Sequence, residues 1–266
     1  MAQHPPANAV QPAHRQGALI IGASSGIGAS LARVLAQRGY AMALVARRED
    51  ALTDLASSLN SAAGGAENAR AYVHDVRDVE SAPELYQRIL ADFSSSGVSL
   101  DLVVYASGLM IGGHTGPWNF EDERATIETN VIGAMRWLGL AAATFAAQGY
   151  GTLAGISSVA GDRGRKGNSA YMASKAALST YLESLHYRLA DRGVRVITIK
   201  PGLVATPMTA GQKTSRLLTA RPESVARRIA DACERGSMTV YVPGFWSLIM
   251  RVIRMLPASV MARLSI

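Results

Sequence analysis

The sequence predicts an α/β protein built as a single domain: a doubly wound sheet of about seven parallel strands with helices on both faces. Three observations support this fold class. Short apolar runs alternate with longer stretches of helical composition along the 266 residues, an order typical of parallel sheets. A glycine-rich turn joins the first apolar run to the first helical stretch. Further along the chain, a Tyr and a Lys stand four residues apart in another helical stretch.

The length and the ends of the chain indicate its domain limits. A chain of 266 residues can bury the core of one large α/β domain. We expect residues 17–243 to form this domain and residues 244–266 to be an amphipathic tail of it. Residues 1–16 hold three Pro and lack the apolar core of a signal peptide, so we expect a disordered lead-in. No apolar run reaches the roughly 18 residues that predict a transmembrane helix.

Composition narrows the compartment and the partners. The single cysteine, Cys233, allows no internal disulfide, and together with the missing secretion signal this favours the cytoplasm. The net charge of +7 favours anionic partners such as nucleotide phosphates or an anionic membrane surface. Because no nucleic-acid motif and no metal-ligand spacing accompany this charge, we expect no nucleic-acid partner and no metal site.

The first predicted strand, residues 18–21, runs directly into a turn with the spacing G-x-x-x-G-x-G. Glycine permits a tight turn and close backbone approach, and residues 29–38 supply a helix whose N-terminus would face an anion. A strand, a glycine turn and a helix start together indicate a dinucleotide site on a Rossmann-type sheet. The turn residues expected to bind the cofactor are Gly22, Ser24, Ser25, Gly26, Ile27 and Gly28.

Arg47 and Arg48 follow the second predicted strand, residues 41–46. A carboxylate at this position would bind the ribose hydroxyls and repel a 2′-phosphate, whereas an arginine can pair with that phosphate. Arg47 therefore favours NADP(H) over NAD(H) as the cofactor, with Arg48 as a further cofactor contact. The alternative is a solvated basic pair that Glu49 and Asp50 neutralise.

The remaining strands and helices are predicted in alternation. Further strands are expected at residues 71–74, 100–104, 149–156, 194–199 and 238–242, and helices at residues 49–60, 80–93, 121–147, 170–189 and 223–235. No internal repeat and no second domain accompany them. The alternation predicts one parallel sheet with helices on both faces.

Tyr171 and Lys175 are the strongest candidates for chemistry. The four-residue spacing places both side chains on one face of the predicted helix, one turn apart. A phenol beside an ammonium loses its proton more easily, so Tyr171 could exchange a proton with a substrate oxygen. Ser158 follows the apolar run before this helix, and its hydroxyl could hold that oxygen. Taken alone, a Tyr and a Lys at this spacing would more often be a surface pair.

Ser158, Tyr171 and Lys175, together with the glycine spacing, resemble the catalytic set and fingerprint of the short-chain dehydrogenase/reductase family, over residues 17–208 at least. The resemblance implies that Asn130 holds a water linking Lys175 to solvent, and that Lys175 also holds the nicotinamide ribose. It further implies a set of cofactor contacts by Asp75, Val76, Ser107, Gly108, Tyr171, Lys175, Pro201, Gly202, Val204 and Thr206. An ordinary strand-end role for Asp75 stays open. The family usually carries Asn-Asn-Ala-Gly where this chain has Tyr-Ala-Ser-Gly at residues 105–108.

A nearer resemblance concerns residues 160–168, 108–110 and the tail. These segments look like the branch of the family that includes a decaprenylphosphoryl keto-pentose reductase. The family implies hydride transfer between NADP(H) and a carbonyl or secondary alcohol, and the branch adds a lipid-linked substrate as an option beside another hydrophobic small molecule. The alternative from another class is a non-catalytic NADP(H)-sensing or scaffold protein on the same fold.

Assembly and membrane contact are the last expectations. The helices at residues 121–147 and 170–189 carry apolar residues on more than one face, such as Trp137 and Leu178, and such helices are buried on both sides. The family pairs these helices, so we expect a homodimer or homotetramer. Residues 245–256 combine large apolar side chains with Arg251 and Arg254. They fit an interfacial helix on the inner face of the membrane, or equally a helix packed on protein.

Overall fold

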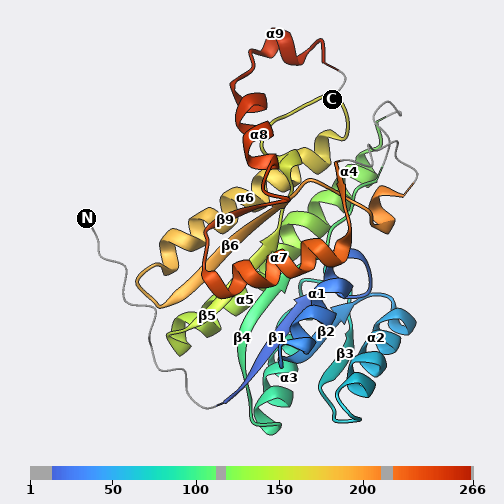
Figure 1. Ribbon diagram of the computed structural model, residues 1–266, viewed down its shortest axis with the longest axis vertical. Helices are drawn as coiled ribbons and strands as arrows, with labels where there is room; N and C mark the ends of the chain where they lie inside the picture. The colour runs from blue at the N-terminus through green and yellow to red at the C-terminus, as the bar shows by residue number, and fades with distance from the viewer. Residues whose placement is uncertain (1–13, 112–117, 211–217, 265–266) are drawn as a thin grey trace.

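The computed structural model in Figure 1 describes residues 14–111, 118–210 and 218–264. Seven strands form one sheet in the order β3-β2-β1-β4-β5-β6-β9, with every neighbouring pair parallel. The strands are β1 (Arg15–Ile21), β2 (Ala41–Ala46), β3 (Ala69–Val73), β4 (Val98–Tyr105), β5 (Gly151–Ile156), β6 (Val194–Pro201) and β9 (Thr239–Val242). This confirms the predicted doubly wound sheet. The strand order reverses between β1 and β4, which opens a crevice at the carboxyl ends of the strands.

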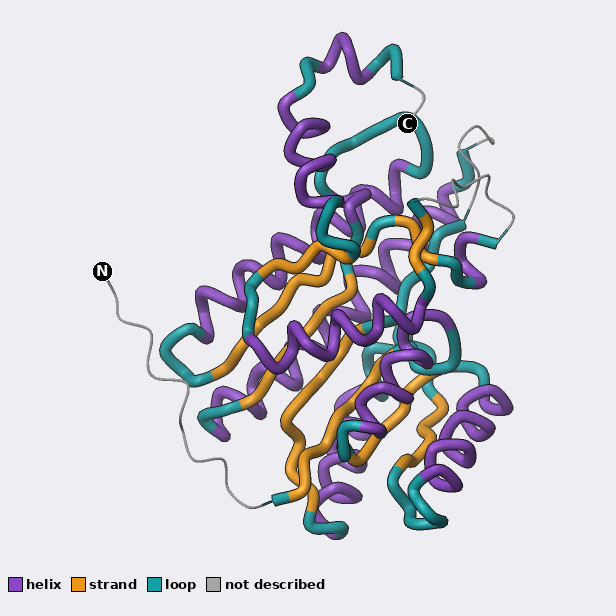
Figure 2. The backbone as a smooth tube through the Cα atoms, in the orientation of Figure 1, coloured by secondary structure: helices purple, strands orange, loops and turns teal. Residues whose placement is uncertain are grey.

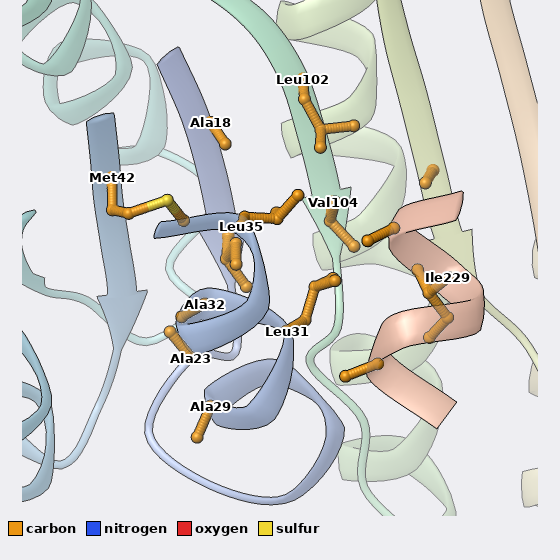
Figure 3. Packing of buried hydrophobic residues seen from close by; sticks show 14 of the residues in the cluster. Ala18, Ala23, Ala29, Leu31, Ala32, Leu35, Met42, Leu102, Val104 and Ile229 are labelled. Carbon is orange, nitrogen blue, oxygen red and sulfur yellow. The ribbon is translucent and has the colours of Figure 1, made fainter. Parts of the chain in front are cut away.

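Helices cover both faces of the sheet, as Figures 1 and 2 show. The longer helices are α1 (Gly26–Gln37), α2 (Glu49–Ala62), α3 (Ala82–Ser95), α5 (Gly133–Gln148), α6 (Ser169–Leu189) and α7 (Pro222–Arg235). Side chains of α1, α2 and α7 join one hydrophobic core, and those of α3, α5 and α6 join a second. Figure 3 shows the first core, where Leu31 and Leu35 of α1 lie near Val104 of β4 and Ile229 of α7.

The first strand begins earlier than predicted. Arg15 and Gln16, which the sequence places in the disordered lead-in, belong to β1, where Arg15 pairs with Val98 of β4. The guanidinium of Arg15 also donates a hydrogen bond to the side chain of Asn68. The lead-in prediction was therefore wrong at these two positions, and residues 1–13 lie outside the described part of the chain.

The long helix predicted at residues 121–147 is three elements. Helix α4 (Phe120–Ile127) passes into a π-helical turn, η1 (Glu128–Ile132), and then into α5. Such turns insert an extra residue into a helix and recur at functional sites. Asn130 lies within this turn and is fully buried.

The tail packs partly on its own domain. It forms α8 (Trp246–Met255) and the short α9 (Ala258–Met261), which stand beyond one end of the sheet in Figure 1. Trp246 and Met250 are buried against Val159, while Leu248 and Val252 are exposed. Ile249 and Ile253 of α8 also pack against this cluster, and the membrane contact of the outer side stays a prediction.

Two further observations concern expectations from the sequence. Among the described residues, no helix has both the length and the apolar character needed to span a bilayer. Most of the apolar residues that suggested an oligomer, including Trp137, Leu138, Leu178 and Leu185, are buried in the core of the chain itself. On the same helices Ile132 and Met135 remain exposed, at 45% and 44%.

Candidate active site

A cleft of about 490 Å³ lies where the carboxyl ends of the strands meet. The glycine turn after β1 forms one wall of it. A Cβ at Gly22 would come within 2.4 Å of the Ser107 backbone nitrogen, and a Cβ at Gly28 within 2.2 Å of the Gly22 oxygen. Gly22 and Gly26 also have positive φ angles of 97° and 56°. The turn therefore requires glycine, and it leaves a backbone cradle at the start of α1 that fits a phosphate.

Arg48 and Arg47 lie on the adjoining wall with different partners. Arg48 donates to the Ser24 hydroxyl through Nε at 3.3 Å and through Nη2 at 3.1 Å. Arg47 instead lies 3.8 Å from a carboxylate oxygen of Asp75. Both arginines line the cleft, but Arg48 is the one attached to the glycine turn.

Asp75, for which the resemblance implies a cofactor contact, is not among the residues that line the cleft, whereas Val76 is. Its carboxylate accepts bonds from Arg77, with Nη2 at 2.6 Å and Nε at 3.0 Å, and from the Arg77 backbone N–H. These bonds lower the pKa of Asp75, with Arg77 as the main cause. The carboxylate is therefore turned toward Arg77, and both the cofactor contact and the strand-end role of Asp75 stay predictions.

Tyr171 and Ser158 meet across the cleft. Burial raises the pKa of Tyr171, and a hydrogen bond with the Ser158 side chain opposes that rise. Ser158 Oγ also accepts a bond from the Ala160 N–H at 3.0 Å, which caps the short 3-10 helix η2 (Val159–Gly161). Asn168 caps the first turn of α6 by accepting from the Tyr171 N–H at 2.9 Å. These two capping bonds fix the backbone beside Ser158 and the backbone beside Tyr171.

Lys175 lies deeper on the same face of α6. Its Nζ donates to the Ile156 carbonyl at 2.9 Å and lies 5.7 Å from the centre of the Tyr171 ring. Burial lowers the pKa of Lys175 to about 8. The sequence argument expected an ammonium to lower the pKa of Tyr171, but burial dominates and the direction is upward. The reason is that burial disfavours the charged form of both groups.

Asn130 sits behind the cleft wall. Its amide bonds the backbone of Leu109 and donates to Ser174 Oγ at 2.9 Å. Leu109 itself lines the cleft, so Asn130 supports the wall from behind. The water-holding role implied by the resemblance stays a prediction, since Asn130 does not line the cleft.

The structure gathers most of the predicted site residues around this one cleft. Those that line it are Gly22, Ser24, Ser25, Gly26, Ile27, Gly28, Arg47, Arg48, Val76, Ser107, Gly108, Ser158, Tyr171, Lys175, Pro201, Gly202, Val204 and Thr206. Asp75 and Asn130 stand outside it. Lining residues that the sequence analysis did not single out include His74, Leu109, Met110 and Met208. His74 could have been found from its place at a strand end, whereas the loop residues carry no such signal.

The fold and the cleft together define a dinucleotide-binding α/β protein, and comparison with known proteins adds the family. A family model described as short chain dehydrogenase matches residues 16–216. The chain therefore belongs to the short-chain dehydrogenase family.

Relatives and solved structures agree with this assignment. A Mycobacterium tuberculosis protein named "Uncharacterized oxidoreductase" is 36% identical over 245 residues, covering 91% of this chain and 94% of its own. A Myxococcus xanthus protein of the same name is 36% identical, covering 90% and 92%. A crystal structure of an actinorhodin polyketide ketoreductase variant with NADPH has a TM-score of 0.74 and 27% identity, covering 87% and 97%. The chain is thus similar to oxidoreductases over most of its length.

Proposed function

We propose that this protein is an NADP(H)-dependent oxidoreductase that moves a hydride between the nicotinamide of its cofactor and a carbonyl or secondary-alcohol carbon. One observation carries the proposal: Ser158, Tyr171 and Lys175 meet in the same cleft as the glycine turn. A purely structural pair of Tyr171 and Lys175 would not need a dinucleotide cradle beside it. The similarity to a ketoreductase variant crystallised with NADPH supports the same chemistry.

Each side chain has a distinct part in the proposed reaction. Tyr171 gives a proton to the substrate oxygen in reduction and takes it back in oxidation. Ser158 is close enough to lower the pKa of Tyr171, so an oxygen bound between the two hydroxyls would be held at the proton donor. Lys175 binds the cofactor ribose and, when protonated, favours the phenolate form of Tyr171. Its lowered pKa keeps the loss of that proton close to neutral pH.

The cofactor preference is proposed for NADP(H) on the strength of the two arginines. Ser24 and Arg48 together present a hydroxyl and a guanidinium beside the glycine turn. That pair suits a phosphate, because a guanidinium makes charge-assisted bonds to phosphate oxygens. Arg47 would add a second positive charge on the same wall, with Asp75 partly neutralising it.

The substrate is proposed to be an apolar carbonyl compound. Leu109, Met110 and Met208 line the same cleft as Tyr171. Methionine side chains adapt their shape to apolar ligands of several forms. A lipid-linked carbonyl, as the nearer branch of the family suggests, is one such substrate, and an ordinary hydrophobic small molecule is the other.

The test is NADPH oxidation across a panel of apolar carbonyl compounds, with Tyr171→Phe as the comparison. Turnover should fall at least ~100-fold in this variant, the usual contribution of a positioned acid, while NADPH binding stays intact. A protein that binds NADPH but turns over no member of the panel would favour the sensor or scaffold alternative. Near-normal turnover by Tyr171→Phe would remove Tyr171 from the mechanism.

Assembly and location are proposed with the function. We propose a homodimer or homotetramer, supported by the exposed Ile132 and Met135 and by the habit of the family. We propose a cytoplasmic protein that contacts the inner face of the membrane through α8. The support for this contact is the row of exposed apolar side chains on α8 beside Arg251 and Arg254.

A further inference from the structure

An ion pair lies beside the turn that carries Ser158. Asp162 follows η2, and its side chain is only 2% exposed. One carboxylate oxygen lies 2.5 Å from Lys200 Nζ on β6. The other accepts a hydrogen bond from the Tyr241 hydroxyl on β9 at 2.7 Å. Neither Asp162, Lys200 nor Tyr241 lines the cleft.

The η2 turn is fixed on two sides. On one side Gly161 lies against α6, where a Cβ would come within 2.6 Å of the Lys175 backbone carbon. On the other side the Asp162 carboxylate holds it to β6 and β9. The Asp162 N–H donates to the Val159 carbonyl at 3.2 Å, which ties the carboxylate directly to the turn. Ser158 therefore precedes a turn whose far end is anchored by one buried side chain.

The C-terminal segment completes the anchor. Val159 packs with Trp246 and Met250 of α8. Arg163 Nη2 donates to the Leu256 carbonyl at 3.1 Å. Tyr241 lies in the strand just before this segment, and burial, together with the bond to Asp162, raises the pKa of Tyr241 to about 12. The C-terminal segment, which lies more than 80 residues after Ser158 in the chain, thus packs against the turn that follows Ser158.

A buried ion pair is poorly explained by stability alone. Taking both charges out of water costs about as much free energy as their attraction returns, and apolar side chains of similar size often serve stability as well or better. What the pair does provide is a fixed position for the Asp162 side chain and its turn, because a buried carboxylate can bond both partners in one position only. A fixed position matters most in a turn beside reacting groups, because small displacements of those groups lower the reaction rate.

We propose that Asp162 is a positioning residue, which holds the Ser158 hydroxyl against Tyr171 through its bonds to Lys200 and Tyr241. The inference rests on the proposed function of Ser158 and Tyr171. Asp162 touches neither substrate nor cofactor in this proposal. Its effect passes through the backbone of η2, from Asp162 back to Ser158.

The experiment measures the ionisation of Tyr171 without needing a substrate. Tyrosinate absorbance is titrated in the wild type, Asp162→Asn and Tyr241→Phe, each with and without Tyr171→Phe, so that the difference reports Tyr171 alone. Because the bond from Ser158 lowers the pKa of Tyr171, a displaced Ser158 should raise this pKa by about 0.5 to 1 pH unit. Lys175, the ionisable group beside the Tyr171 ring, is kept in every variant.

The sign of the change separates positioning from simple charge effects. Removing the negative charge of Asp162 would by itself lower the pKa of Tyr171, opposite to the expected rise. Tyr241→Phe keeps every charge at neutral pH and removes one hydrogen bond only. It also keeps the ring, so it is the variant that decides if Asp162→Asn does not fold.

A second cluster offers matched controls. Asp92 accepts from the Tyr72 hydroxyl at 2.8 Å and lies 3.4 Å from an Arg70 nitrogen, on the opposite edge of the sheet. Asp92→Asn and Tyr72→Phe therefore remove an equivalent carboxylate and hydroxyl away from the cleft. They should leave the pKa of Tyr171 unchanged.

Turnover gives the second readout. With any carbonyl that the wild type reduces, Asp162→Asn and Tyr241→Phe should lower kcat/KM by about 10- to 100-fold at unchanged NADPH affinity. An unchanged Tyr171 pKa in Tyr241→Phe would overturn the proposal, whatever the turnover. A wild type that reduces no carbonyl would overturn the proposed function, and the tyrosine titration would still decide the role of Asp162.

Discussion

The side-chain amide of Asn130 pairs with the backbone of Leu109 at both of its ends. The Leu109 N–H donates to Oδ1 at 2.7 Å, and Nδ2 donates to the Leu109 carbonyl at 2.9 Å. The Asn130 side chain therefore bonds the backbone N–H and C=O of Leu109 in the way that the backbone of a neighbouring strand would. This joins the wall of the cleft to the helix that leads into α5.

Asn130→Ala should destabilise the protein and reduce turnover. Leaving the Leu109 donor and acceptor without a partner costs about 1–3 kcal/mol for each buried group. Asn60→Ala is the matched control, because the Asn60 amide bonds the backbone of Asn68 and Ala69 in a similar way away from the cleft. Urea unfolding should show a lower free energy of unfolding for both variants. Only Asn130→Ala should lose activity under conditions where it is folded. Equal activity of the two variants would contradict a role for Asn130 in the site.

Cofactor choice should depend on Arg48 more than on Arg47. Arg48→Gln removes a guanidinium that the structure holds at Ser24. The affinity for NADPH should fall by about 1–3 kcal/mol, the scale of a charge-assisted hydrogen bond, while NADH affinity stays the same. Arg47→Gln serves as the comparison, since Arg47 lies near Asp75. Both variants are titrated with NADPH and with NADH to compare their affinities. A larger loss of NADPH affinity in Arg47→Gln would show that Arg47, not Arg48, binds the phosphate.

Lys175→Met should raise stability while it abolishes turnover. Burial lowers the pKa of Lys175 from its ordinary 10.5 to about 8, so the folded protein bears a cost of about 3 kcal/mol below pH 8. The lost bond to Ile156 offsets part of this gain, which leaves about 1–3 kcal/mol. Denaturant unfolding at neutral pH measures the difference. A less stable variant would show that the ammonium is better solvated than the structure indicates.

The same variant gives a pH signature whose sign follows from proton linkage. Between pH 8 and 10.5 the unfolded wild type keeps the Lys175 proton that the folded protein has lost. The free energy of unfolding of the wild type therefore rises with pH across this range relative to Lys175→Met. The advantage of the variant should be complete below pH 8 and vanish near pH 10.5.

Helix α8 should adhere to anionic vesicles through its outer face. Phe245, Leu248, Val252 and Met255 are 45%, 63%, 54% and 79% exposed, respectively. Residues 243–266 contain three arginines and no acidic residue, so binding should weaken with salt. Vesicle co-sedimentation tests this with Leu248→Ser/Val252→Ser, which leaves the buried Trp246 and Met250 in place.

The lipid experiment also bears on the substrate. Binding of the wild type that is lost in the double variant would support a lipid-linked carbonyl. If the wild type stays in the supernatant with anionic vesicles at low salt, the membrane contact is wrong. A hydrophobic small molecule would then be the better substrate proposal.

The oligomer should depend on the exposed residues of η1 and α5. Light scattering at micromolar concentration should give the mass of a dimer or tetramer for the wild type. Ile132→Glu/Met135→Glu should reduce that mass, because charges at a buried interface must be desolvated. Val73→Glu is the control, since Val73 is similarly exposed on β3. A monomeric wild type would contradict the proposal.

The sequence predicted the sheet well because strand and helix patterns are local. The apolar run at residues 18–21 and the glycine spacing after it predicted β1, the turn and α1 in their observed order. The break in the long helix at Asn130 could not be predicted, since its sequence continues a helical composition and the π turn arises from packing. Which side of α8 packs on the domain could not be predicted for a similar reason: Ile249 and Ile253 pack against a cluster that includes Val159, which lies far away in the chain.

By itself, the sequence determined the features that depend on consecutive residues: the glycine turn at Gly22–Gly28, and the placement of Tyr171 and Lys175 on one face of a helix. Only the tertiary structure decided which partners these side chains meet. Asp162 pairs with Lys200 and Tyr241, which lie 38 and 79 residues away in the chain. Burial also reversed the expected direction of the Tyr171 pKa. The physical reason is that pairing, desolvation and pKa depend on distances in space, which no local pattern specifies.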